Sequence, residues 1–206
     1  MKRSELDDLV EQLSRFIPKD SCVDIARMII DYNVKLTVTK KRITKLGDYR
    51  SPHKSIAYHR ISINGDLNPY MFLLVLLHEF AHLLIWEKHQ RRVKAHGSEW
   101  KEAYRKLYDK FSLYFSEDVK LIIDEHFKNL KATTCNDEFL TRHLMHMNSH
   151  EEIELLSDLS PGDVFESNGR KFEMLNKRRT RFLCEELESK KKYLVSGSAV
   201  VVRLNE

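Results

Sequence analysis

The chain has 206 residues, of which 42% are hydrophobic and 32% are charged, and its formal net charge is +4 at pH 7. This length predicts one principal domain with room for a small second module, and it suffices for a hydrophobic core. Six glycines and four prolines exclude a collagen-like or low-complexity chain, and the aromatic content excludes wholesale disorder. The mildly basic balance is compatible with nucleic-acid binding but does not indicate it.

The N-terminal segment shows neither the apolar core nor the small-residue cleavage site of a signal peptide. The longest nearly apolar stretch, Met71 to Trp86, is shorter than a membrane-spanning helix and contains two histidines and a glutamate. The three cysteines are widely separated and show no CxxC spacing, which is typical of proteins in a reducing compartment. These features predict a soluble cytoplasmic protein without membrane contact.

The first elements in chain order are two short helices and two strands. Ser4 and Asp7 predict a capping-box variant before a helix that Pro18 terminates, and a second helix is expected near 23–30. Alternating apolar and polar residues predict strands at 35–43, with a basic outer face, and at 55–63, with turn and loop at 47–52. The strand at 55–63 is the candidate edge strand with which an extended peptide would pair.

The central helix is predicted to begin at Pro69, with Asn68 as its N-cap, and to run through Trp86. Its first half is apolar nearly all round, which is typical of a helix in the middle of a fold. A polar turn at 91–95 follows. Further helices are expected at 98–115, with Ser98 as N-cap, at 117–129 and at 137–156.

After residue 159 the pattern changes to short β-rich runs. They lie at 164–166, 171–175, 181–187 and 193–204, with a hairpin signal at Asn168-Gly169 between the first two. The sequence therefore predicts an α+β protein with two parts. A helical domain with a small β-sheet spans 1–157, including a helical extension at about 117–157. A small antiparallel β module, for which a barrel is one interpretation, spans 158–206.

The strongest functional signal is His78-Glu79-Phe80-Ala81-His82, an HExxH motif. Two helical residues four apart share one face and lie about 6 Å apart along the axis, so both imidazoles can converge on one ion. Glu79 lies on the adjacent flank, where it can hold a metal-bound water and accept its proton as general base. Two histidines and a glutamate on a core helix would otherwise be costly to bury.

A third ligand has to come from elsewhere in the chain. His89 lies on the helical face of His82 but about 10 Å further along the axis, too far for an ion held at about 2 Å. His96 follows the polar turn, so the chain can fold back and bring it to the motif. We therefore favour His96, and Glu99 or Glu102 stays open as a carboxylate ligand.

Several segments together resemble the SprT-like family, which includes the bacterial SprT proteins and the eukaryotic Spartan proteases. These segments are Val34–Thr39, Leu46–Arg50, Arg60–Asn64, the HExxH motif and His96-Gly97-Ser98-Glu99-Trp100. The resemblance implies a compact zincin-like fold around the HExxH helix, one Zn²⁺ ion held by His78, His82 and His96, and Glu79 as the catalytic residue. Spartan-type members cleave proteins crosslinked to DNA. Many bacterial members end in a four-cysteine zinc ribbon, which the β module replaces here.

Basic residues gather at Lys40, Lys41 and Arg42, and again at Arg178 and Arg179. They predict a phosphate-binding surface for DNA or RNA, with solubilising faces of strands and loops as the alternative.

Two further groups have a structural and a functional interpretation. The histidines at 143, 146 and 150 share one face of a predicted polar helix, where solvent exposure is favoured over a second metal site. Tyr49, Tyr58 and Trp100 could line a substrate cleft, but aromatic side chains near core elements more often pack.

The sequence thus predicts a zinc-dependent endopeptidase acting on a protein or peptide substrate, with DNA-associated proteins as candidate substrates. Zinc and Glu79 would activate a water molecule for attack on the peptide carbonyl. The alternative is a nucleic-acid-associated binding protein whose zinc is structural or vestigial. A third hypothesis is a zinc hydrolase that acts on non-peptide amides.

Overall fold

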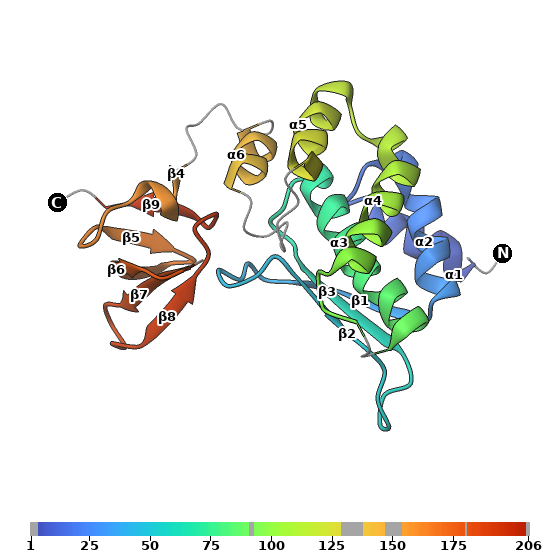
Figure 1. The fold of residues 1–206 in the computed structure, drawn as a ribbon, viewed down its shortest axis with the longest axis horizontal. Coiled ribbons are helices and arrows are strands. Elements are labelled where there is room, and N and C mark those ends of the chain that lie inside the picture. Colours follow the sequence, from blue (N-terminus) through green and yellow to red (C-terminus); the bar gives the residue numbers. More distant parts are fainter. Residues whose placement is uncertain (1–3, 91–92, 129–137, 147–153, 180, 205–206) are drawn as a thin grey trace. The chain divides into compact units, whose positions relative to one another are not determined.

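The computed structural model describes residues 4–90, 93–128, 138–146, 154–179 and 181–204 (Figure 1). They form two compact units. The first comprises Met1–Lys40 and Gly47–Thr134, and the second comprises Lys41–Leu46 and Cys135–Glu206. The chain is of mixed α+β class, as predicted.

The described residues contain six α-helices and two β-sheets. The helices are α1 (Glu5–Leu13), α2 (Cys22–Asp31), α3 (Pro69–His89), α4 (Ser98–Phe111), α5 (Glu117–Lys128) and α6 (Glu138–His146), with single 3-10 turns η1 (Lys19–Ser21), η2 (Ser112–Tyr114) and η4 (Leu156–Asp158). The strands are β1 (Val34–Thr39), β2 (Gly47–Arg50), β3 (His59–Asn64), β4 (Glu154–Leu155), β5 (Val164–Ser167), β6 (Arg170–Lys177), β7 (Phe182–Glu186), β8 (Lys192–Val195) and β9 (Val200–Arg203).

The sheet of the first unit has the strand order β1-β3-β2. Strand β3 is parallel to β1, with Ile61 opposite Leu36, and antiparallel to β2, with Ile61 opposite Tyr49. The prediction of an edge strand at 55–63 is therefore wrong, because β3 has a partner on each side and β2 lies at the edge. The loop predicted at 47–52 is wrong as well, since β3 supplies hydrogen-bonding partners for 47–50 that local turn signals do not reveal.

Helices pack onto this sheet, with α2 against β1 and α3 against both β2 and β3. Every residue from Met71 to Ala81 is buried, so α3 is the core helix that its apolar sequence predicts. By length and composition alone α3 could cross a membrane, but 67% of its most apolar window is buried inside the protein. Burial within the first unit accounts for this hydrophobicity.

The predicted helix starts are confirmed at α1 and α3 and corrected at α4. The capping box before α1 is present, and Asn68 Oδ1 accepts a hydrogen bond from the Met71 N–H at 2.8 Å. At α4 the N-cap is Gly97, and Ser98 is already helical. The Ser98 hydroxyl donates to Glu99 Oε2 at 3.1 Å, so it does not cap the helix.

The second unit contains a six-stranded antiparallel sheet with the order β4-β9-β5-β6-β7-β8. Strands β5 and β6 form the predicted hairpin at Asn168-Gly169, and both turn residues have positive φ, 58° and 70°, as a two-residue hairpin turn requires. Phe165 faces Phe172 across this hairpin, and their rings stack at 5.4 Å. The predicted antiparallel β module is present.

Two predicted elements end differently. In the region of the helix expected at 137–156, the described residues form α6 at Glu138–His146. Glu154–Leu155 forms the strand β4, because β9 pairs with it. The run at 193–204 is divided into β8 and β9 by residues 196–199. Of the three histidines on the predicted helix, His143 is exposed, the side chain of His146 is not described, and His150 lies outside the described residues.

The segment Lys41–Leu46 belongs to the second unit although it lies between β1 and β2 in the chain. Ile43 is 8% exposed and joins an apolar core that includes Phe165. Lys41 Nζ donates to the Val200 carbonyl at 3.4 Å, and the Lys41 carbonyl accepts from Asn168 Nδ2 at 3.2 Å. The strand predicted at 35–43 consequently stops at residue 39. The bounds of the two compact units also differ from the division between residues 157 and 158 that the sequence pattern predicts.

Replacing Ile43 with alanine should lower the local stability of the second unit by about 2–4 kcal/mol, because the substitution leaves a cavity in its core. Val202→Ala, at a residue that is 65% exposed on β9, should cost less than about 0.5 kcal/mol. Amide hydrogen exchange of β5 and β6 measures both effects. Equal protection in the two variants would contradict the placement of Ile43.

Candidate metal centre

Helix α3 presents the two histidines of the HExxH motif on one face. His78 and Glu79 are each only 4% exposed, and His82, one turn later, is half-buried. The rings of His78 and His82 lie 5.0 Å apart, centroid to centroid. The four-residue spacing therefore brings both imidazoles together, as the sequence predicts.

The chain reverses between α3 and α4 and returns His96 to this face. Helix α3 ends at His89, the C-cap residue Gln90 has a φ of 55°, and His96 has a φ of 58°. A non-glycine residue in this left-handed region costs on the order of 1–2 kcal/mol. His96 lies in a tight turn directly before α4. In this turn the Gly97 N–H donates a hydrogen bond to the Lys94 carbonyl at 2.9 Å.

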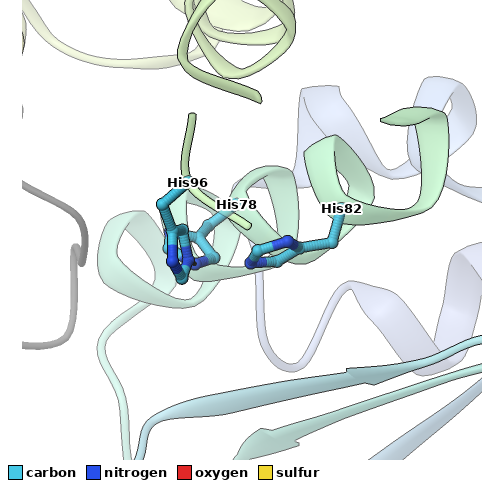
Figure 2. A group of neighbouring side chains, drawn as sticks. All are labelled: His78, His82 and His96. Carbon is cyan, nitrogen blue, oxygen red and sulfur yellow. Dashed lines mark hydrogen bonds between the residues drawn. The ribbon is translucent and has the colours of Figure 1, made fainter. Parts of the chain in front are cut away.

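The three imidazoles converge, as Figure 2 shows. One ring nitrogen from each of His78, His82 and His96 lies within 4.8 Å of the other two. The Nε2 atoms of His78 and His96 are 3.3 Å apart. Tetrahedral zinc with bonds of about 2.05 Å would separate two nitrogen ligands by about 3.3 Å. The donor set therefore fits a zinc ion, and these three residues can hold a metal.

The other candidate ligands do not join this group. Among the described residues, the three-histidine group contains neither His89, Glu99 nor Glu102. The Glu102 carboxylate instead accepts from Lys106 Nζ at 2.6 Å. Of the alternatives left open by the sequence, the structure thus brings His96 to the motif.

Burial keeps the three imidazoles in the neutral form that binds metals. It lowers the pKa of His78 well below its usual value, and the neighbouring imidazoles of His82 and His96 lower it further. The pKa of His82 falls to about 4, mainly through burial and then through His96. Burial also lowers the pKa of His96. Neutral imidazole nitrogens need not lose a proton before they coordinate an ion.

Two aromatic residues of α4 pack against the imidazoles. Trp100 is 1% exposed, and its ring lies 4.6 Å from both His78 and His96 and 5.3 Å from His82. Tyr104, one turn later on the same helical face, lies 5.4 Å from the His78 ring. The packing role favoured for Trp100 from the sequence is therefore confirmed, and this packing restricts the orientation of all three imidazoles.

Space beside Glu79 depends on a glycine of the edge strand. A Cβ atom added at Gly47 would overlap Glu79 Oε1 and lie 2.8 Å from Val75 Cγ1. The sequence gives no sign of this contribution, because the local pattern at 47–52 predicts a loop. Nor does the sequence single out His59, which is 5% exposed and bonds to Tyr49, since a single histidine in a strand forms no motif.

The predicted nucleic-acid residues are divided between the two units. Lys40 is exposed after β1, whereas Lys41 and Arg42 are half-buried in the second unit. Arg42 Nη2 donates to the Leu46 carbonyl at 3.2 Å. Arg178 and Arg179 are exposed in the connection from β6 to β7.

Purified protein should bind one Zn²⁺ ion per chain, and His96→Ala should weaken this binding by more than about 100-fold, beyond the usual effect of an outer-shell change. His89→Ala is the matched control, because this histidine of α3 lies outside the three-histidine group. Competition with a chelating dye measures both affinities. Unchanged zinc affinity in His96→Ala would contradict the assignment of the third ligand.

The comparisons with known proteins agree with the resemblance noted in the sequence. The model of the SprT-like family matches residues 8–136, which include the HExxH motif and His96. No curated protein and no solved structure matches the chain. Because the family model covers more than half of the sequence and includes all three converging histidines, the chain belongs to the SprT-like family.

Proposed function

We propose that the protein is a zinc-dependent metallopeptidase that hydrolyses peptide bonds, with a zincin-like active site on α3. The observation that carries this proposal is the convergence of three neutral imidazoles within 4.8 Å beside a buried glutamate that directly follows the first of them. Membership of the SprT-like family supports it independently. The described cysteines Cys22 and Cys184 are free, buried thiols, which supports a cytoplasmic setting.

His78, His82 and His96 would hold the ion, and Glu79 would handle the protons. Bound zinc supplies Lewis-acid polarisation of the peptide carbonyl and lowers the pKa of water to about 7. The Glu79 carboxylate takes a proton from the attacking water and then donates it to the nitrogen of the leaving amine. Its burial beside Gly47 restricts the directions in which the carboxylate can turn.

The substrate would bind along the edge of the sheet next to this site. Strand β2 is an edge strand of the described sheet, and it packs against α3. An extended peptide adds to such an edge through main-chain hydrogen bonds, which select for backbone conformation rather than for one side chain. This arrangement supports a protein or unfolded-peptide substrate over a small non-peptide amide.

Replacing Glu79 with glutamine should reduce peptide hydrolysis by about 10²–10⁴-fold, the usual contribution of a general base, while zinc binding stays normal. The control is Glu102→Gln, at an exposed carboxylate of α4. Cleavage of a fluorogenic peptide library and of a protein crosslinked to DNA would be measured in parallel. Wild-type rates in a zinc-loaded Glu79→Gln protein would refute the mechanism.

We also propose, as a second function of the chain, contact with DNA or RNA through the second unit. The favouring observation is that Arg178 and Arg179 are both exposed in the β6–β7 connection. Two adjacent guanidinium groups in such a connection can each reach a phosphate.

The double variant Arg178→Glu, Arg179→Glu should weaken binding of a labelled oligonucleotide. It should also make the slope of log affinity against log salt less steep by about 1.4–1.8, since each lost phosphate contact contributes about 0.7–0.9. Lys101→Glu with Lys110→Glu changes the net charge equally at exposed positions of α4 and should leave the slope unchanged. If the salt slope changed equally in both variants, oligonucleotide binding would depend on net charge alone and not on these two arginines.

A further inference from the structure

A chain of hydrogen bonds runs behind the metal centre through three elements of the first unit. The Tyr49 hydroxyl on β2 lies 2.9 Å from His59 Nδ1 on β3. His59 Nε2 lies 3.2 Å from Glu87 Oε1 near the end of α3. The two bonds therefore connect the edge strand, the central strand and the helix that carries the HExxH motif.

The position of Glu87 determines the direction of these bonds. Burial lowers the pKa of His59, although Glu87 opposes the shift, so the ring is neutral and carries one N–H. A carboxylate accepts hydrogen bonds only, and His59 must therefore place its proton on Nε2. Nδ1 is then an acceptor, and the Tyr49 hydroxyl donates to it.

The far end of this chain contacts a metal ligand. The ring of Tyr49 is nearly parallel to the imidazole of His82, with an interplanar angle of 7° and centroids 6.3 Å apart. His59 is itself held by edge-to-face packing on Trp86 at 5.4 Å. A rotation about the Cα–Cβ bond of Tyr49 would carry its hydroxyl away from His59 and break this bond, so the bond fixes the position of the ring beside His82.

We propose that Glu87, His59 and Tyr49 form a positioning device that holds the His82 imidazole in the orientation required for metal binding. The proposal rests on the metal site of the function proposed above and does not depend on the role of Glu79. An apolar side chain would suffice for a purely structural contact at this place. A buried imidazole instead costs free energy unless both of its ring nitrogens have hydrogen-bond partners. Tyr49 and Glu87 satisfy both, which fixes one tautomer and one ring orientation.

The test compares variants that remove the ring, the hydroxyl or only the charge. Tyr49→Ala removes the stacked ring and should weaken zinc binding by about 10–100-fold, the range found for outer-shell partners. Tyr49→Phe keeps the ring but loses the bond to His59, and it should have a smaller effect of up to about tenfold. Glu87→Gln keeps an amide oxygen that can accept from His59 and should retain the wild-type affinity. Tyr58→Ala is the control, because this neighbouring half-buried tyrosine packs under Lys35.

The visible absorption spectrum of the Co²⁺-loaded protein is the second readout, because it reports ligand geometry rather than stability. A shifted spectrum in Tyr49→Ala and Tyr49→Phe, with wild-type spectra in Glu87→Gln and Tyr58→Ala, is the expected result. If the Tyr49 variants lower only the free energy of unfolding and leave the spectrum and the zinc affinity unchanged, the proposal is overturned. Neither readout uses peptide hydrolysis, so a Glu79→Gln protein with full activity would refute the peptidase mechanism and leave this proposal standing.

Discussion

The burial of ionisable side chains on an apolar core helix is the constraint on which the first unit depends. Helix α3 is buried throughout from Met71 to Ala81, and His78 and Glu79 lie inside this stretch. In such surroundings an unpaired charge is strongly disfavoured, so the imidazoles stay neutral, and each buried polar atom needs a partner. Neutral imidazoles whose ring nitrogens lie within 4.8 Å of one another have a natural partner in a divalent metal ion.

The elements around α3 supply the remaining parts of the centre. The reversal after His89 returns His96 at the cost of a left-handed backbone conformation, and α4 then places Trp100 and Tyr104 against the imidazoles. Strand β2 contributes Gly47, the absence of whose side chain leaves room for Glu79. Strain, close packing and a missing side chain thus occur together at one site, which is the pattern expected where a fold is shaped by function rather than by stability alone.

The second unit shows how a short segment can belong to a core distant from it in sequence. Residues 41–46 connect two strands of the first sheet, yet Ile43 is buried with Phe165 and other residues of the second unit. Alternation at 35–43 predicts one continuous strand, because periodicity reports that Ile43 is buried but not which core buries it. Composition likewise indicates a β-rich module after residue 159 without revealing that this segment joins it.

The features that could be predicted from the sequence are those that depend on local geometry. Helical spacing brought His78 and His82 to one face, the Asn68-Pro69 pair marked the start of α3, and Asn168-Gly169 specified a hairpin. The polar turn before His96 was sufficient to favour it as third ligand. Only long-range contacts make 47–50 an edge strand, place Gly97 rather than Ser98 at the N-cap of α4, and let His59 link Tyr49 to Glu87. These outcomes depend on pairing and packing between residues far apart in the chain, for which neighbouring residues carry no signal.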